Sequence, residues 1–255
     1  MKVVTFNIRM DNPEDGKNAF PYRRPLIQKI IEERKPDIIG FQEALPHMAD
    51  WLKECLCDYY IVGHGREKDL SGEHVLIAYK KTAYNLHYTK TFWLSATPSV
   101  PGSRYRGQSI CPRTCICAVF EDKNHGLFQV WNTHLDHTGK FARRSALEQI
   151  MRTIHAEGKK VLPFILMGDF NTLPGQKELQ PLFAAEFASS GLRDVTAASG
   201  GTFHNYGKTQ NEKIDYIFAS AAFSTQGCAL WNDCEDGLYL SDHYPLEAEL
   251  SLNRE

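Results

Sequence analysis

An apolar run that stops abruptly at polar residues is the feature that most constrains the fold of this chain. Residues 161–167 are apolar throughout and lead into Gly168-Asp169-Phe170-Asn171. A short apolar run of this kind predicts a buried β-strand. A carboxylate at the end of a buried strand is costly unless it is paired or bound to a metal. The motif therefore predicts either a functional acid or a simple Asx turn at the strand end.

The spacing of Asp169 and Asn171, which are two residues apart, helps to compare a functional site with a simple turn. Side chains at positions i and i+2 of a strand point to the same side. We therefore expect the two side chains to face one spot, with an acceptor beside a donor. That arrangement suits holding and polarising a water molecule. The motif alone leaves both the turn and the functional pair open.

The first forty-odd residues repeat this pattern of strands that end on oxygen-bearing side chains. Residues 3–8 predict a buried strand that ends near Asn7, and residues 37–41 predict a second that leads into Glu43. Between them, residues 25–33 place apolar side chains on one helical face, with a proline suited to the first turn. The order is strand, helix, strand.

The rest of the chain predicts many strands and few helices. Further strands are expected at residues 59–62, 75–79, 89–94, 113–120, 127–133, 213–219 and 246–252, and helices at 46–55, 142–154 and 179–187. About ten strands with helices mostly between them favour an α/β fold of two packed sheets with helices outside. The chain has no linker-like or repeated segment, so we expect one domain over residues 1–255.

Polar residues recur at or near the ends of these strands. They are Asn7, Glu43, His134, Asp169, Asn171, Asp215, Asp242 and His243. Each alone has an ordinary structural explanation, such as a cap, a turn or a buried pair. Together they indicate a site, because strand ends of packed sheets converge on one rim. Carboxylates and carboxamides favour Mg²⁺ or Mn²⁺ over zinc, and such a site with two histidines and an arginine suits phosphate chemistry.

Six segments resemble, in order, the motifs of the endonuclease/exonuclease/phosphatase family. They are Thr5-Phe6-Asn7-Ile8-Arg9, Gln42-Glu43, Asn132-Thr133-His134, Gly168-Asp169-Phe170-Asn171, Ile214-Asp215-Tyr216-Ile217 and Ser241-Asp242-His243-Tyr244-Pro245. The resemblance spans nearly the whole chain. It implies a four-layer α/β sandwich, in which two packed mixed β-sheets are flanked by helices and the site lies at one rim. It also implies hydrolysis of a phosphate ester that depends on Mg²⁺ or Mn²⁺.

The resemblance further implies roles for the residues around the metal and the water. Glu43 corresponds to the main metal ligand, with Asn7 beside it, and Asp242 to a ligand of the same or a second metal. Asp169 corresponds to the group that orients or deprotonates the attacking water. Asn171 is expected to help hold the phosphate.

The remaining implied roles concern the phosphate and the leaving group. His243 is expected to contact the scissile phosphate, paired with Asp215. His134 is expected to stabilise the transition state or the leaving oxygen. Arg113 occupies a position where the family often has a phosphate-binding basic residue. Some nucleases of the family pair the equivalent of His134 with a carboxylate; here Glu73 is the nearest one, and the partner of His134 stays open.

Asp136 and His137 extend the Asn-Thr-His motif. They could serve the site or merely cap the loop. The segment Arg104-Tyr105-Arg106 lies in a long connection and could contact a phosphate or a base. A solvated loop explains it equally well.

Charge bears on the substrate. Lys and Arg number 29 against 31 Asp and Glu, and the net charge is −2. Strong binding of long nucleic acid normally needs a basic face, so the composition favours a nucleotide or another small substrate, whereas family analogy favours nucleic acid.

The first hypothesis for the function is a phosphodiesterase, possibly a nuclease. The alternative is a phosphomonoesterase acting on a small phosphorylated metabolite or an inositol phosphate. A non-enzymatic binding protein is disfavoured by the completeness of the residue set.

The remaining expectations concern location and partners. Seven cysteines without a CxxC pair suggest reduced thiols. No signal peptide and no apolar stretch of about 20 residues is visible. These features favour a cytoplasmic protein without a membrane span, although a trimmed secreted protein would look the same. No obligate protein partner is inferred.

Overall fold

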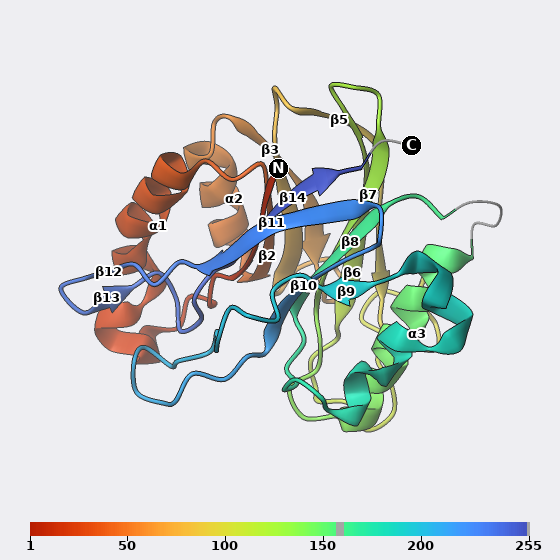
Figure 1. Ribbon diagram of the computed structural model, residues 1–255. Helices are drawn as coiled ribbons and strands as arrows, with labels where there is room; N and C mark the ends of the chain where they lie inside the picture. The colour runs from red at the N-terminus through yellow and green to blue at the C-terminus, as the bar shows by residue number, and fades with distance from the viewer. Residues whose placement is uncertain (157–160, 254–255) are drawn as a thin grey trace.

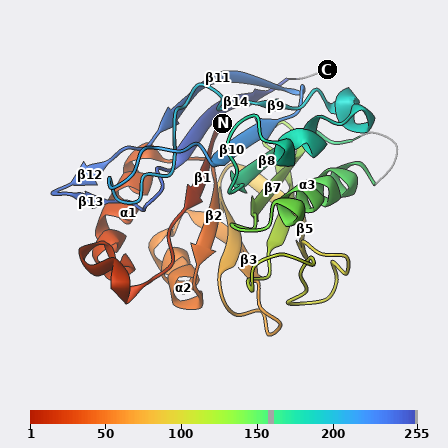
Figure 2. The same cartoon turned by 90° about the horizontal axis from the view of Figure 1, so that it is seen from below.

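Two β-sheets packed face to face form the centre of the molecule, and helices cover both outer faces (Figures 1 and 2). The computed structural model describes residues 1–156 and 161–253. Both sheets are mixed, as the sequence predicts, and each has six strands, so the α/β sandwich is confirmed. The extent of a single domain over residues 1–255 stays a prediction.

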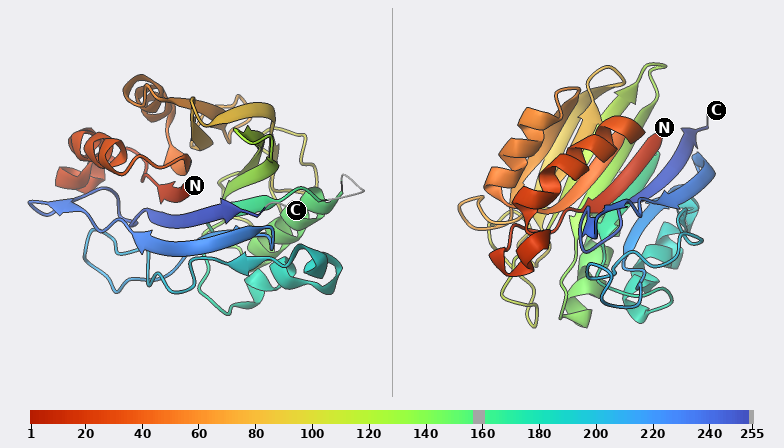
Figure 3. Two further views of the ribbon diagram at one scale, coloured as in Figure 1. Left: turned by 45° about the horizontal axis from the view of Figure 1, so that its top comes forward. Right: turned by 90° about the vertical axis from the view of Figure 1, so that its left-hand side faces the viewer.

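The first sheet has the strand order β11-β14-β1-β2-β4-β3. The bounds are β11 (Phe223–Leu230), β14 (Leu246–Leu252), β1 (Lys2–Asn7), β2 (Ile38–Ala44), β4 (His74–Lys80) and β3 (Tyr59–Gly65). Strands β1 and β2 are parallel and are connected through η1 (Pro13–Asn18) and α1 (Phe20–Arg34), while α2 (Pro46–Cys55) follows β2. Strand β1 also pairs with β14, so the first and last strands lie side by side (Figure 3).

The second sheet has the order β5-β6-β7-β8-β10-β9. The bounds are β5 (Tyr84–Trp93), β6 (Thr114–Asp122), β7 (Leu127–His134), β8 (Phe164–Asp169), β10 (Asp215–Ala219) and β9 (Arg193–Asp194). Strands β7 and β8 are parallel, and α3 (Lys140–His155) lies between them in the chain. Two 3-10 helices, η2 (Lys177–Phe183) and η3 (Ala185–Ser190), follow β8, and β12 (Cys234–Glu235) pairs with β13 (Leu238–Tyr239).

Three apolar cores stabilise these layers. One packs α1 and α2 against the first sheet, one packs α3 and η2 against the second, and one fills the space between the sheets. Each sheet therefore buries both faces at its centre, which explains the continuous apolar runs of the central strands. The carboxyl ends of β1, β2, β7 and β8 carry Asn7, Glu43, His134 and Asp169.

A buried polar link joins the two sheets near this rim. Asn132 on β7 donates to the backbone oxygens of Phe41 and Leu76, at 2.9 and 2.8 Å, and accepts from Gln42 at 2.7 Å. Gly40 permits this approach, because a Cβ there would lie 2.8 Å from the Asn132 side chain. Two residues of the recognised motifs thus hold the sheets in register rather than contact a substrate.

Several predicted element bounds are wrong. Helix α1 begins at Phe20, five residues before the predicted start, with Pro21 in its first turn and Pro25 inside it. Strand β8 begins at Phe164, because Pro163 cannot donate a ladder hydrogen bond. Strand β10 begins at Asp215 instead of residue 213.

Other elements differ in kind or were not predicted. The helix expected at residues 179–187 is two 3-10 segments, the first of which contains Pro181. Strand β5 begins at Tyr84, and β11 is mostly exposed and lacks the apolar pattern of the central strands. The described residues form fourteen strands rather than about ten. Among them, no helix has the length and apolarity that crossing a membrane requires.

Candidate active site

A cavity of about 820 Å³ opens at the rim where the polar strand ends meet. Seven of the nine predicted site residues line it. They are Glu43, Arg113, His134, Asp169, Asn171, Asp242 and His243. The other two, Asn7 and Asp215, are each 1% exposed and bond to residues of the cavity wall. The structure therefore brings the predicted residues to one place.

Glu43 reaches the cavity from a β-bulge near the end of β2. Its backbone φ is 64°, a left-handed value that turns the chain out of the strand. One carboxylate oxygen accepts from Asn7 Nδ2 at 3.0 Å and the other from the backbone N–H of Met10 at 3.1 Å. Burial raises the pKa of Glu43, but these two hydrogen bonds, together with the charges of His243 and Arg9, lower that pKa below its usual value.

Asn7 links the two central carboxylates. Its Nδ2 donates to Glu43 and to Asp169, both at 3.0 Å, and its Oδ1 accepts from the backbone N–H of Arg9 at 3.0 Å. The carboxamide thus holds Glu43 and Asp169 close together at the ends of β2 and β8. Its predicted role as a metal ligand stays a prediction.

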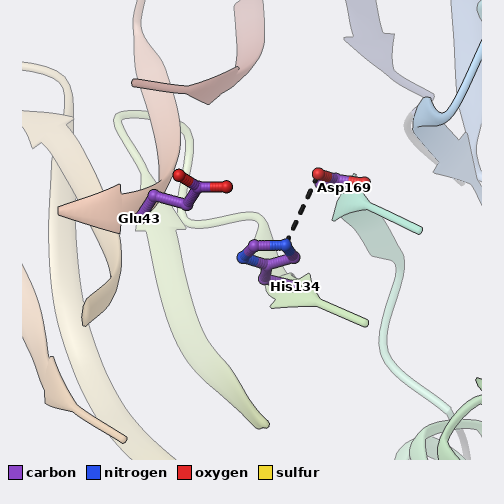
Figure 4. Close-up of side chains that lie close together, drawn as sticks. All are labelled: Glu43, His134 and Asp169. Atoms are coloured by element: carbon purple, nitrogen blue, oxygen red, sulfur yellow. Dashed lines mark ion pairs between the residues drawn. The ribbon is translucent and has the colours of Figure 1, made fainter. Parts of the chain in front are cut away.

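Asp169 lies at the centre of the site. Its Oδ2 is 3.5 Å from His134 Nε2 (Figure 4) and 3.9 Å from His243 Nε2. Its Oδ1 accepts from the backbone N–H of Asn171 at 2.8 Å, which is the Asx turn that the sequence left open. Burial, with the nearby charge of Asp215, raises the pKa of Asp169 to about 7.

Asn171 reaches the cavity by a different route from the one predicted. The strand ends at Asp169, and Asn171 has a φ of 48°, so the strand argument for a shared face is wrong. Its Nδ2 donates to the backbone oxygen of Leu135 at 3.0 Å. Both side chains nevertheless line the cavity.

His243 and Asp215 form a buried pair. His243 Nδ1 lies 2.8 Å from Asp215 Oδ2, and the Phe203 ring packs 5.0 Å from the imidazole. Burial lowers the pKa of His243, but the Asp215 carboxylate outweighs it and raises that pKa to about 10. A protonated His243 is a cationic donor facing Asp169 across the cavity.

Glu73 is the carboxylate nearest to the second nitrogen of His134. Its Oε2 lies 3.9 Å from His134 Nδ1 and accepts from Arg66 Nη1 at 2.6 Å. Burial, with the charges of Arg113 and Arg66, holds the pKa of His134 well below its usual value. The neutral imidazole therefore lies between Glu73 and Asp169.

Arg9 is a cavity residue that the sequence analysis did not single out. Its guanidinium bonds Asp15 at 3.0 and 3.1 Å and lies 3.8 Å from Asp242. Burial, with the charge of Glu43, raises the pKa of Asp242 against the opposing charge of Arg9. The only sequence signal for Arg9 was its position two residues after Asn7.

Arg113 and its neighbours form another wall of the cavity. Arg113 Nη2 donates to His137 Nδ1 at 3.0 Å, and both residues line the cavity. Asp136 instead caps its own loop, accepting from the backbone N–H of Gly139 at 2.6 Å. Of the two residues that could serve the site or cap the loop, Asp136 therefore caps the loop and His137 lines the cavity. The segment 104–106 contributes no residue to the cavity wall.

Two groups of side chains have a geometry that could hold a cation. In the first, ligand atoms of Glu43, His134 and Asp169 all lie within 4.8 Å of one another (Figure 4). In the second, Asp169 shares such a cluster with Asp215 and His243. The hydrogen bond from His243 to Asp215 already occupies the second cluster, so the first is the better site. Two carboxylates brought this close repel each other, and a divalent cation would relieve that repulsion.

The fold of two packed, mixed β-sheets is that of the endonuclease/exonuclease/phosphatase superfamily, whose members are phosphoester hydrolases. The sequence profile of the Endonuclease/Exonuclease/phosphatase family matches residues 4–243. The chain therefore belongs to this family, whose members are generally dependent on divalent metals.

Solved structures and a curated relative agree with this assignment. An endonuclease/exonuclease/phosphatase from Bacteroides vulgatus is 32% identical, with a TM-score of 0.91, covering 99% of this chain and 98% of its own. The mannosyl-6-phosphatase of Bacteroides thetaiotaomicron VPI-5482 is 28% identical, with a TM-score of 0.87 and coverages of 99% and 100%. An uncharacterised protein of Acanthamoeba polyphaga mimivirus is 29% identical over 96% of this chain and 98% of its own.

Proposed function

We propose that this chain hydrolyses a phosphate ester by attack of a water molecule that Asp169 orients. The observation that carries the proposal is the position of Asp169. Its carboxylate lies between the Glu43–His134 cluster and the His243–Asp215 pair. A carboxylate whose pKa is raised to about 7 is a stronger base than usual and is suited to accept a proton from water near neutral pH.

A divalent cation, Mg²⁺ or Mn²⁺, suits the first cluster, because Glu43 offers it a carboxylate oxygen. Glu43 would be its main ligand, with Asp242 and Asn7 as further predicted oxygen donors. When bound, the cation would neutralise charge on the phosphate and act as a Lewis acid.

The chain's own residues account for the remaining steps. Asp169 holds the water and takes its proton, while Asn171 helps to hold the phosphate. Protonated His243, fixed by Asp215, donates to a non-bridging oxygen and stabilises the charge that develops there. His134 hydrogen-bonds the leaving oxygen.

The substrate class is the second part of the proposal. The sequence favoured a phosphodiester, and a nuclease activity remains a candidate. Three observations favour a small substrate instead, and one of them, a relative described as a phosphatase, favours a monoester. The net charge is −2, and a relative with a TM-score of 0.87 is described as a mannosyl-6-phosphatase. A cavity of about 820 Å³ is also within the usual range for a small ligand.

A substrate panel tests both parts. The purified chain is assayed with p-nitrophenyl phosphate, bis-p-nitrophenyl phosphate, mannose 6-phosphate, inositol phosphates, DNA and RNA, each with Mg²⁺ and with EDTA. We expect hydrolysis that requires the cation, and fastest turnover on a small monoester. Faster turnover of the diesters would overturn the monoester assignment. Turnover of nothing on the panel, or turnover unchanged by EDTA, would overturn the proposed function.

A further inference from the structure

Arg113 is buried on the cavity wall with unused hydrogen-bonding capacity. It is 5% exposed, yet its Nε and Nη1 make no hydrogen bond with the described part of the chain. The nearest carboxylate, that of Asp136, is 3.9 Å from Nε. Buried guanidinium groups are normally satisfied, so unpartnered donors beside a cavity point to a ligand.

The one hydrogen bond that Arg113 makes to a side chain fixes the orientation of His137. Because an arginine only donates, His137 Nδ1 must accept, and the ring proton lies on Nε2. No residue in 1–156 or 161–253 bonds that Nε2. His137 therefore offers one N–H donor from a ring that lines the cavity.

Lys140, the first residue of α3, adds a cation to the same wall. It is exposed and makes no ion pair within the described ranges. The nearby Arg143 is paired with Glu178 at 3.1 Å and donates to the backbone oxygen of Asp136.

The charges on this wall leave a cationic excess. Of the cavity carboxylates beside these side chains, Glu178 pairs with Arg143, and Glu73 accepts from Arg66 at 2.6 Å. Asp136 does not line the cavity and bonds the backbone N–H of Gly139 at the N-terminus of α3. The side chains of Arg113, His137 and Lys140, rather than the helix end, are therefore what the cavity presents.

We propose that Arg113, His137 and Lys140 form a second oxyanion subsite, so that the preferred substrate carries a second phosphate or a carboxylate besides the scissile phosphate. This inference rests on the proposed function and specifies its substrate class. Arg113 places this subsite next to His134, because both side chains line the same cavity and the small pocket beside it. A planar guanidinium and two further donors suit the oxygens of a phosphate or a carboxylate.

Three small esters with different tails test the subsite. They are n-propyl phosphate, 1,3-propanediol bisphosphate and 3-phosphooxypropionate, all with Mg²⁺. We expect kcat/KM to be about tenfold higher for an anionic tail, mainly through KM, since a charged hydrogen bond contributes this much. Preference for the bisphosphate alone would identify a second phosphate as the ligand, and preference for the propionate alone a carboxylate. Equal kcat/KM for all three would overturn the subsite.

Matched variants show which side chains cause the preference for an anionic tail. His137→Ala and Lys140→Gln should each reduce the preference for an anionic tail to about twofold or less. Arg144→Gln removes the same charge from an exposed position on α3 outside the cavity wall, and should retain the preference. A preference that all three variants retain equally would overturn the assignment to His137 and Lys140.

The outcome also separates this inference from the proposed function. If the wild-type chain hydrolyses all three esters without preference, the subsite fails and the hydrolase stands. If it hydrolyses none, the proposed function fails, and calorimetric titration with 1,3-propanediol bisphosphate decides the subsite. Binding that is at least about tenfold weaker in Lys140→Gln supports the subsite, and equal binding overturns it.

Discussion

At the scale of single residues, the site depends on a small number of buried acids and bases that shift each other's protonation. Asp169 faces two histidines whose pKa values move in opposite directions. The pKa of His134 falls because of burial and nearby arginines, whereas that of His243 rises because of Asp215. One imidazole is therefore neutral and the other cationic near neutral pH. A cationic donor suits the charge on a phosphate, and a neutral imidazole can still hydrogen-bond a leaving oxygen.

The His243–Asp215 pair predicts how stability depends on pH when a chelator removes divalent cations. The pKa of His243 rises from its usual 6.5 to about 10, so its stabilisation is complete below about pH 6.5 and is lost as pH rises towards 10. The raised pKa of Asp169 likewise stabilises the folded chain at low pH, and this stabilisation is lost as pH rises from 3.8 to about 7. The difference in unfolding free energy between wild type and Asp215→Asn should therefore shrink from pH 6.5 to pH 9.

Chemical denaturation at several pH values measures this difference. His125→Gln, which removes an exposed histidine on the turn between β6 and β7, serves as the control. The difference in unfolding free energy between wild type and His125→Gln should not shrink in this way from pH 6.5 to pH 9. A gap between wild type and Asp215→Asn that widens with pH would contradict the assigned ion pair.

At the scale of elements, Asn132 on β7 is predicted to stabilise the contact between the sheets. Asn132→Ala leaves the buried backbone oxygens of Phe41 and Leu76 without this partner, and we expect a loss of about 2–4 kcal/mol in unfolding free energy. Asn85→Ala, on the exposed edge strand β5, should cost about 0.5 kcal/mol or less. Equal losses in urea denaturation would show that the link contributes little.

The central elements could be predicted from the sequence, because strands buried on both faces leave long apolar runs. The polar residues that end β1, β2, β7 and β8 were equally visible. Strand β11 was not, since its residues are mostly exposed and do not alternate. The early start of α1 was hidden because Pro25 suggested a first turn, while the structure accommodates it inside the helix.

The composition of the candidate site was predictable, but its internal contacts were not. Strand ends indicated Glu43, His134 and Asp169, since carboxylates and histidines are rarely placed there without a partner. Arg9 ends a recognised motif and Glu73 is a possible partner of His134, but the sequence predicted no definite contact for either, and only tertiary packing shows that both line the cavity. The turn that carries Asn171 to the cavity depends on a left-handed backbone that a strand pattern cannot reveal.

At the scale of the whole molecule, cation binding should be coupled to folding. A cation at the Glu43 cluster binds only the folded chain, so saturation at about 100 times Kd stabilises it by about 2.7 kcal/mol. For a chain of 255 residues this corresponds to a rise in Tm of about 5–10 °C. Differential scanning calorimetry with Mg²⁺ and with EDTA measures the shift.

Glu43→Gln provides the matched control for that shift, because it keeps the shape of the side chain and removes its charge. We expect the variant to lose most of the Mg²⁺-dependent rise in Tm. A rise of equal size in the variant would place the cation elsewhere.

The turnover of Asp169→Asn shows most directly whether Asp169 orients and deprotonates the attacking water. The measurement is kcat on p-nitrophenyl phosphate with saturating Mg²⁺, alongside circular dichroism to show that the fold is retained. We expect a loss of at least about 100-fold in kcat, in the range typical of general base catalysis. A folded Asp169→Asn variant that retains wild-type, Mg²⁺-dependent turnover would contradict it.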